Sequence, residues 1–308
     1  MTLTQLHYTL AVAEERNFTQ AAEKCFVTQP TLSMQVQKLE EELSVRLFNR
    51  NTKPITLTPV GSKVVEQAKV ILNEAKRMED VVAMEKGIIG GEFRLGIIPT
   101  VMPTLLPLFL STFIKKFPRV NLKIEELNTT AIVEKLKNEK LDAGIAATPL
   151  DDSKLIEKPL YYEPFVGYIP KKHPLSRLKS LAIEDLEKID MLVLEDGHCF
   201  REHVLKLCQK TNPSSSFNLN SGSFETLIHL ANDGMGMTLL PYLQTRNLST
   251  KDMVNLKSFE SPEPAREISM IYSKNKLKIP VIESLTSTIE SIMRSAIKFE
   301  NIRLITPN

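Results

Sequence analysis

The stretch Val27-Thr-Gln-Pro-Thr-Leu-Ser-Met-Gln35 opens a predicted helix near the start of the 308-residue chain. Thr28 is a residue type that caps helices, and Pro30 suits a first turn, where a missing N–H costs little. The apolar residues that follow are spaced four, three and four, so they form one buried stripe: Leu32, Val36, Leu39 and Leu43. The pattern predicts a helix with one apolar face and one free polar face.

The sequence on either side of this helix completes a small domain. Residues 4–17 form a predicted helix in which Leu6, Leu10 and Ala13 share a face, and Thr19 is expected to cap a second, short helix. On the other side, 49–58 contains Pro54 and alternating apolar residues, which predicts a short hairpin wing. Two short helices, a tight turn and a third helix predict a helix-turn-helix that places one helix in the major groove of DNA.

Local charge supports this prediction, although the net charge is only +2. No acidic residue occurs from Lys24 to Leu39 or from Leu43 to Lys63, and Glu40, Glu41 and Glu42 lie at the far end of the helix. The polar face can therefore approach phosphates and base edges without repulsion. Spacing alone also fits a different reading, a small helical module with a solvated polar face.

Residues 59–86 form a predicted long helix with a heptad seam, consisting of Val64, Ala68, Ile71, Ala75, Met78 and Val82. Such a seam predicts self-association as a coiled coil. The alternative is an amphipathic helix that packs on its own domain.

After residues 87–91 the pattern changes to alternating strands and helices. Strands are predicted at 93–98, 120–126, 141–146, 164–169 and 191–194, and helices at 103–117, 131–138, from about 197, at 226–232 and at 281–299. This alternation predicts an α/β region with largely parallel sheets.

The number of cysteines and the lack of a signal-peptide pattern indicate the expected cellular compartment. Three cysteines make no secreted disulfide framework. Charged residues 14–16 interrupt any signal peptide, and no apolar stretch could span a bilayer. We expect a cytoplasmic protein without membrane contact, in which a disulfide would be a signal.

Two of the cysteines lie nine residues apart, in Leu194-Glu-Asp-Gly-His-Cys-Phe-Arg-Glu-His-Val-Leu-Lys-Leu-Cys208. Asp196 or Gly197 is expected to cap a helix with Cys199 in its first turn, where the helix N-terminus, Arg201 and His198 would lower the thiol pKa. Peroxide converts a thiolate to a sulfenic acid, which a second thiol can trap. The residues alone also allow simple packing, and a zinc site is poor because the spacing matches no standard ligand set.

In a continuous helix these two thiols would face opposite ways, about 13 Å apart along the axis. Phe200, Val204, Leu207 and Cys208 share the apolar face. A disulfide needs Cα atoms within about 7 Å, so oxidation of this pair requires the helix to unwind. Cys25 is expected to fill the core of the N-terminal domain.

Several ordered motifs resemble the LysR-type transcriptional regulators: Phe18-Thr-Gln-Ala-Ala-Glu, the quoted stretch 27–35, Leu39-Glu-Glu-Glu-Leu, Leu47-Phe-Asn-Arg50 and Leu57-Thr-Pro-Val-Gly61. The resemblance covers the whole chain. It implies an α+β multidomain protein, with a mainly α winged helix-turn-helix at 1–58, a coiled-coil linker helix at 59–88, and an effector domain of periplasmic-binding-protein type at 89–308. Its lobe 1 is expected at about 89–161 plus 268–308, and lobe 2 at about 162–267. The DNA-binding residues implied are Gln29, Pro30, Thr31, Ser33, Gln35 and Arg50, to which the charge of the wing adds Lys53.

The cysteine motif and several further pieces, among them Leu95-Gly-Ile-Ile-Pro-Thr-Val and Pro262-Glu-Pro-Ala-Arg-Glu-Ile268, resemble the OxyR branch, the peroxide sensors of this family. That resemblance implies a peroxidatic Cys199, a resolving Cys208 and a peroxide pocket formed by Thr100, Thr129, His198 and Arg266. From the residues alone, the two threonines could equally be turn or helix caps and the arginine a surface ion pair. The stretch 209–213 departs from the pattern, because Gln-Lys-Thr-Asn-Pro stands there in place of more apolar residues.

The function expected is a peroxide-sensing activator of oxidative-stress genes. The expected partners are promoter DNA, RNA polymerase and further copies of the same chain in a dimer or tetramer. No cofactor and no metal are expected. The alternative is a LysR-type regulator that binds a metabolite between its lobes. A thiol peroxidase enzyme would leave the helix-turn-helix unexplained, and a periplasmic binding protein would need a signal peptide.

Overall fold

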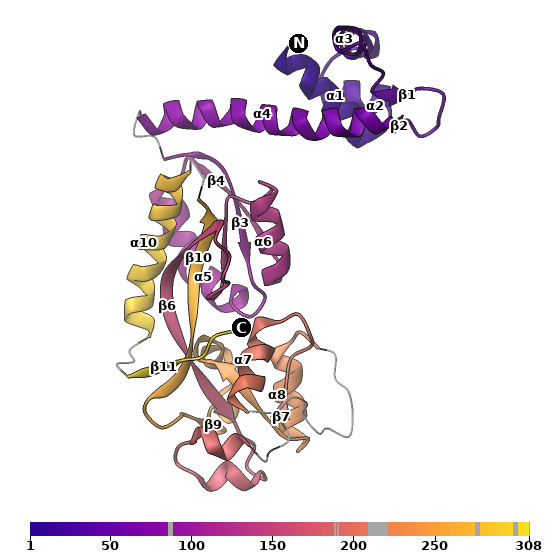
Figure 1. Cartoon of the computed structure of the whole chain (residues 1–308). Helices are drawn as coiled ribbons and strands as arrows, with labels where there is room; N and C mark the ends of the chain where they lie inside the picture. Colours follow the sequence, from indigo (N-terminus) through magenta and orange to yellow (C-terminus); the bar gives the residue numbers. More distant parts are fainter. Residues whose placement is uncertain are drawn as a thin grey trace. The chain divides into compact units, whose positions relative to one another are not determined.

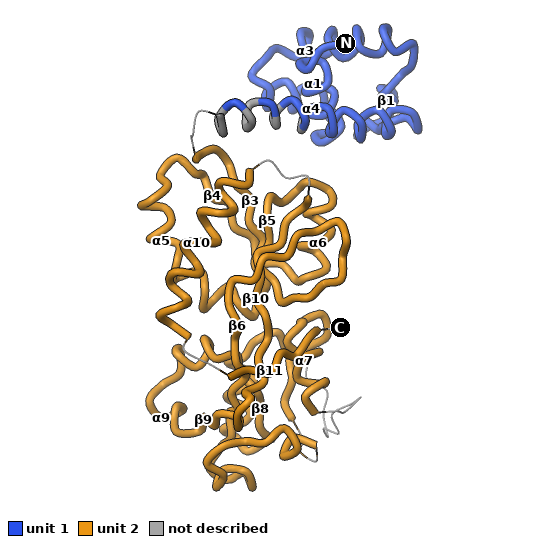
Figure 2. Tube along the Cα trace, turned by 60° about the vertical axis from the view of Figure 1, so that its left-hand side comes forward, with its two compact units in different colours: residues 1–88 blue, residues 89–308 orange. Residues whose placement is uncertain are grey.

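The computed structural model describes residues 1–308 except 86–88, 188, 190, 209–220, 275–277, 298–300 and 308. The contacts divide the chain into two compact units, 1–88 and 89–308 (Figure 2). None of the described helices is both long enough and apolar enough to cross a membrane. The stretch 209–213 and part of the expected linker at 86–88 lie outside the described residues.

The first unit has the predicted order of elements: α1 (Leu3–Glu15), α2 (Phe18–Lys24), α3 (Gln29–Glu42), the hairpin β1 (Phe48–Asn49) and β2 (Thr56–Leu57), and α4 (Pro59–Glu85). Thr28 caps α3 as predicted. The cap predicted for α2 is wrong, because the helix begins earlier: Asn17 Oδ1 accepts from the N–H groups of Thr19 and Gln20, at 2.8 and 3.3 Å.

The core of this unit shows what the long helix contributes. Leu32, Val36 and Leu39 of α3 are fully buried, but Leu43 is 37% exposed because α3 ends before it. Ala68 of α4 is buried in this core, and Val64 and Ile71 pack against it. Met78 and Val82 are 70% and 49% exposed. The seam therefore packs on its own domain in its first half, and its second half is uncovered in the single chain.

The second unit contains one mixed sheet with the path β4-β3-β5-β10-β6-β8-β7 (Figure 1). The strands are β3 (Gly91–Ile97), β4 (Val120–Glu126), β5 (Ala143–Thr148), β6 (Leu155–Tyr168), β7 (Met191–Leu192), β8 (Met237–Pro241), β9 (Leu256–Lys257), β10 (Glu263–Ser273) and β11 (Ile302–Leu304). The helices are α5 (Met102–Lys116), α6 (Thr129–Lys137), α7 (Cys199–Leu207), α8 (Phe224–Asn232), α9 (Thr250–Met253) and α10 (Ile279–Ala296), with 3-10 turns η1 (Pro174–Arg177), η2 (Ile183–Leu186) and η3 (Tyr242–Asn247).

The expectation of largely parallel sheets is wrong for the centre of this unit. The pairs β3–β4, β3–β5 and β7–β8 are parallel, as helix crossovers require. The long strands β6 and β10, however, pair antiparallel with each other, with β5 and with β8. They join the two ends of the unit without a helix between them.

Two hydrophobic cores lie along this sheet, and we call the regions around them lobe 1 and lobe 2. The core of lobe 1 gathers residues of β3, β5, α5, α6 and α10, and the core of lobe 2 gathers residues of α7, α8 and β8. In lobe 1, α6 and α10 cover opposite sides of the strands (Figure 1). The expected placement of all of 268–308 in lobe 1 differs from the structure at its end, because Ile305 packs against the core of lobe 2.

Candidate functional site

Cys199 is the first residue of α7, in the first turn as predicted. The predicted cap at Asp196 or Gly197 is wrong: His198 occupies the N-cap position and makes no side-chain cap bond. The helix starts later because Gly197 has a φ of +91°, a conformation that favours glycine and lies outside the helix. The half-buried Cys199 side chain packs against the core of lobe 1.

A pocket of about 240 Å³ opens at Cys199 between the two lobes. Thr129, Thr130, Ala147 and Leu150 line it from lobe 1, and Gly197, His198, Cys199 and Glu202 line it from lobe 2. Pro307, near the end of the sequence, completes the lining. Two of the four residues expected in the peroxide pocket, Thr129 and His198, thus lie on its wall with the thiol.

The charge environment of the thiol differs from the prediction. Burial raises the pKa of the Cys199 thiol. The Arg266 charge, the Thr129 hydroxyl and the backbone near Phe200 and Ala147 act in the opposite direction and lower that pKa, but burial outweighs them. Burial therefore opposes ionisation of the thiol, and the groups that favour the thiolate are already in place around it.

Thr129 supplies a hydroxyl beside the Cys199 thiol. It is the first residue of α6, whose cap is Asn128, so it is not the helix cap that was considered for it. Its Oγ1 is buried and has no N or O hydrogen-bond partner among the described residues. This hydroxyl is free to donate to the Cys199 sulfur or to a bound molecule.

Arg266 and Thr100 are buried and are not among the described residues that line the pocket. Arg266 is fully buried, donates to Thr100 Oγ1 at 2.9 Å and forms an ion pair with Glu163 at 2.7 Å. A surface ion pair for Arg266 is thus ruled out. Its guanidinium also lies 5.1 Å from the centroid of the Phe200 ring, one residue after Cys199. Arg266 therefore acts on the site as a fixed charge.

The two cations expected next to Cys199 have other partners. Arg201 Nε lies 2.8 Å from Asp196 Oδ1, and Arg201 also donates to the Leu194 carbonyl. His198 Nε2 lies 3.7 Å from Glu195 Oε1. The predicted source of positive charge was therefore wrong for Arg201, and Arg266 takes that role.

Cys208 lies at the other end of α7, where it is the C-cap residue. It is 4% exposed and belongs to the core of lobe 2, with its Sγ 3.6 Å from Met191 Sδ. Both cysteines are free thiols. The helical geometry confirms that the two thiols face different cores, so they cannot meet while α7 is intact.

Two residues of this site, Glu163 and Pro307, were missed by sequence reasoning, and His203 was considered only as a poor zinc ligand. Glu163 is 1% exposed, and its Oε1 also accepts from the Leu243 N–H at 3.0 Å. An acid that follows a run of apolar residues in β6 signals a buried partner, but the predicted strand began at 164, whereas β6 begins at Leu155. His203 and Pro307 carried no comparable signal.

The face of α3 that is predicted to bind DNA is uncovered in the first unit. Gln29, Pro30 and Thr31 are exposed at its N-terminus, Ser33 and Gln35 are half-buried, and Lys53 is exposed on the wing. Thr31 Oγ1 lies 2.8 Å from Thr28 Oγ1, so this hydroxyl also belongs to the helix cap. The other expected contact, Arg50, has a more specific place.

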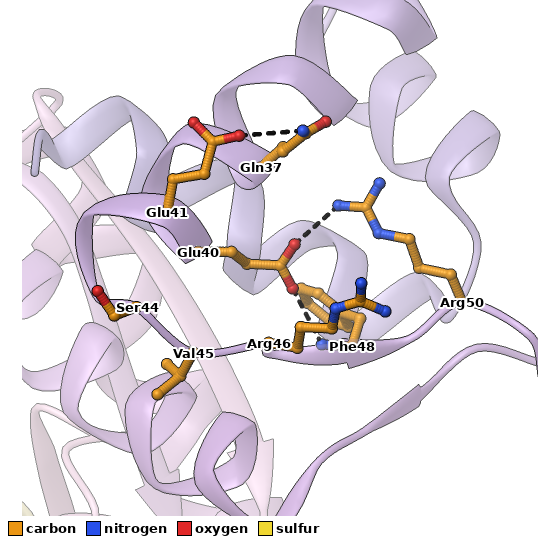
Figure 3. A pocket seen from close by; sticks show the side chains of 8 residues that line it. All are labelled: Gln37, Glu40, Glu41, Ser44, Val45, Arg46, Phe48 and Arg50. Atoms are coloured by element: carbon orange, nitrogen blue, oxygen red, sulfur yellow. Dashed lines mark hydrogen bonds and ion pairs between the residues drawn. The ribbon is translucent and has the colours of Figure 1, made fainter.

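Arg50 joins the wing to α3 (Figure 3). Its Nη2 lies 2.8 Å from Glu40 Oε2, and its guanidinium covers the Phe18 ring at 5.1 Å. Glu40 also accepts from the N–H groups of Leu47 and Phe48, at 2.7 and 3.3 Å. Arg50 thus fixes the wing against the helix and leaves part of its fork exposed.

Two other expectations concern cysteine and metal. Cys25 is the C-cap of α2 and packs against the first unit's core. Among the described residues, no group of three or more His, Cys, Asp or Glu side chains is arranged to hold a metal ion.

Comparison with known proteins agrees with these two regions. Residues 3–62 match the model of the bacterial regulatory helix-turn-helix protein, lysR family, and residues 87–293 match the LysR substrate binding domain. A hydrogen peroxide-inducible genes activator of Pectobacterium carotovorum is 34% identical, over 96% of this chain and 97% of its own length.

Two solved structures are similar over most of their length. A full-length OxyR variant from Pseudomonas aeruginosa has a TM-score of 0.73 and 34% identity, with 94% of each chain covered. A hydrogen peroxide-bound OxyR variant from Corynebacterium glutamicum has a TM-score of 0.63 and 29% identity, with 96% of this chain and 93% of that chain covered. From the two matched domain models and the 34% identical relative, the chain belongs to the LysR family of helix-turn-helix regulators.

Proposed function

We propose that this protein is a DNA-binding transcriptional activator that senses hydrogen peroxide through Cys199 and Cys208. The observation that carries the proposal is the pair of thiols at opposite ends of α7, one in the pocket between the lobes and one in the core of lobe 2. A hydrogen peroxide-inducible genes activator among the relatives, and a peroxide-bound OxyR variant among the similar structures, support it.

The first chemical step is attack of the Cys199 thiolate on a peroxide oxygen. The Sγ–O bond forms as the O–O bond breaks, sulfur loses two electrons, and the leaving oxygen takes the thiol proton to become water. Thr129 and His198 can hold the peroxide, and Arg266 with the Thr129 hydroxyl favours the thiolate. Thr100 holds the Arg266 guanidinium in place through its 2.9 Å bond.

The second step is disulfide formation, which requires a conformational change in α7. The Cys208 thiol attacks the sulfenic acid sulfur, forming the disulfide and releasing water. Because the two Cα atoms are about 13 Å apart along an intact helix, and a disulfide needs about 7 Å or less, α7 must unwind. Unwinding withdraws Phe200, Val204 and Leu207 from the core of lobe 2. The conformational change is therefore a requirement of the bond.

The output of this switch would be a change in how the protein binds promoter DNA. The exposed face of α3 would contact bases through Gln29, Ser33 and Gln35, while Arg50 and Lys53 would serve the phosphate backbone or the minor groove. The exposed second half of the α4 seam would join copies of the chain into a dimer or tetramer. We place the protein in the cytoplasm, where thiols are normally reduced, with RNA polymerase as a further partner.

The test separates the two thiols. Cys199→Ser should abolish peroxide consumption, because a serine hydroxyl is not ionised near neutral pH. Cys208→Ser should consume one equivalent in the first turnover and form no intramolecular disulfide. Hydrogen exchange across 195–208 should rise on oxidation of the wild type only, together with a changed promoter footprint.

Cys25→Ser is the control and should behave as the wild type throughout. A confirmed Cys199–Cys208 disulfide with unchanged exchange and unchanged footprints would show that the bond forms without signalling. The second candidate, a regulator that binds a metabolite at Thr129, Thr130 and Glu202 in the same pocket, would then be the better function.

A further inference from the structure

The last described segment, residues 301–307, leads from lobe 1 to the Cys199 pocket. It follows α10, whose buried side chains belong to the core of lobe 1, and β11 then adds to the edge of β10 as a parallel strand. The Ile305 N–H donates to the Ala265 carbonyl at 2.8 Å, and Ile305 packs against the core of lobe 2. Figures 1 and 2 both place the end of the chain beside α7.

This anchoring holds Pro307 at the pocket. Every other lining residue belongs to 129–150 or to 197–202, so Pro307 is the only described lining residue contributed by a third segment. It is half-buried, two residues beyond the anchored Ile305. A proline ring fixes its own φ, so ordering it costs less entropy than ordering a longer side chain.

The same segment also covers the first turns of α7. His203 is fully buried, and its Nδ1 lies 2.6 Å from the Cys199 carbonyl oxygen. Its Nε2 makes no well-formed hydrogen bond within the described residues, and the nearby backbone of Ile305 raises its pKa less than burial lowers it. Residues 305–307 therefore border both the helix that bears the thiol and the space in front of it.

We propose that Pro307, held in place by residues 302–306, forms a wall of the oxidant pocket and restricts Cys199 to small hydroperoxides. This inference rests on the proposed function, since it concerns which oxidant reaches the same thiol. Hydrogen peroxide is only slightly larger than water and leaves the wall undisturbed. An organic hydroperoxide carries an alkyl group, and the ring of Pro307 occupies part of the space which that group needs.

The chemistry is the same for both oxidants, so selectivity is a matter of access. With an organic hydroperoxide the Sγ–O bond forms, the O–O bond breaks, and an alcohol leaves with the thiol proton in place of water. Removing a wall changes the fit of the alkyl group and not the reacting atoms. The change should therefore appear in the ratio of the two rate constants.

The test compares Pro307→Gly and removal of residues 306–308 with Arg303→Ala, an exposed residue of β11 outside the pocket lining. Second-order oxidation of Cys199 is followed by stopped flow with hydrogen peroxide and with cumene hydroperoxide. We expect the hydrogen peroxide rate to stay within about twofold, and the rate with cumene hydroperoxide to rise about tenfold in the two wall variants only. An unchanged ratio in both wall variants would overturn the proposal.

A second measurement keeps this inference separate from the proposed function. In a Cys25→Ser, Cys208→Ser background, only Cys199 can be alkylated. Opening the wall should speed labelling by a bulky maleimide about tenfold and labelling by iodoacetamide much less. If hydrogen peroxide fails to oxidise Cys199 in the parent, the proposed function fails, while the labelling ratio still decides whether Pro307 is a wall. Equal acceleration of both reagents would refute size selection.

Discussion

Glu163 and Arg266 set the charge beneath Cys199. Each is essentially inaccessible to water, and the acid accepts two hydrogen bonds from the guanidinium and one from the Leu243 backbone. A buried pair of this kind is strongly destabilised when one partner is removed, because the other charge is left uncompensated. Here the surviving charge would also act on a reactive thiol.

Glu163→Gln is therefore expected to have two effects. The free energy of unfolding should fall by about 3 kcal/mol, because Arg266 stays buried and charged. The pKa of Cys199 should also fall, since the positive charge that favours the thiolate is no longer offset. Urea unfolding and the pH profile of iodoacetamide alkylation measure the two effects, with the exposed Glu126→Gln as control. An unshifted alkylation profile would mean that Arg266 does not act on the thiol.

His203 predicts a pH dependence of stability. Burial is the main cause that lowers its pKa, from 6.5 to about 4. The unfolded chain binds the proton more readily, so this contribution to stability is present at neutral pH and is lost as the pH falls from about 6.5 towards 4. The loss should approach about 2 kcal/mol at pH 4.5. His203→Gln should show a smaller loss than the wild type in urea unfolding, and parallel losses would contradict the assignment.

At the scale of elements, α3 and β4 could be predicted closely from the sequence. In α3 the helix cap, the proline and the apolar spacing all indicate the same helix. In β4 the alternation typical of a strand is uninterrupted. β10 was missed, since its pattern contains Arg266 and Glu267, and only a partner on another strand explains a buried charge there. The pKa direction of Cys199 was missed for the same reason. The position of Cys199 at the start of a helix can be read from the local sequence. The surroundings that set its pKa include Thr129, Ala147 and Arg266, which come from distant segments.

The long helix α4 yields a prediction that separates its two halves. Met78 is 70% exposed in the chain, while Ile71 packs against the core of the first unit. Met78→Asp should lower the oligomeric mass without lowering the melting temperature of the first unit, because a charge in the seam has no compensating partner. Ile71→Asp should lower both. Light scattering measures the oligomeric mass, and thermal melting measures the stability of the first unit. An unchanged mass for Met78→Asp would exclude this seam as the surface of self-association.

For the whole molecule, DNA binding should depend on two kinds of contact. Gln29→Ala should cost about 1–3 kcal/mol on the specific promoter alone, because a base contact carries sequence information. Lys53→Ala should weaken specific and non-specific binding alike and reduce the slope of log affinity against log salt by about one. Fluorescence anisotropy at several salt concentrations measures both. The control is Lys123→Ala in β4, and an unchanged slope for Lys53→Ala would remove the wing from the DNA interface.

The strands β6 and β10 belong to both lobes, and their pairing shifts register between Ile268 and Ser269. The lobes are thus joined by a twisted ribbon of two strands and not by a single flexible linker. Such a ribbon resists being pulled apart but yields to torsion, and the register shift lies at its lobe 1 end, where β10 is also paired with β5. A change in α7 would then reach lobe 1 as a rotation of one lobe about the axis of the ribbon. Formation of one disulfide would then produce a rotation of one lobe relative to the other. A rotation is the kind of motion that realigns paired DNA-binding domains along a helical duplex.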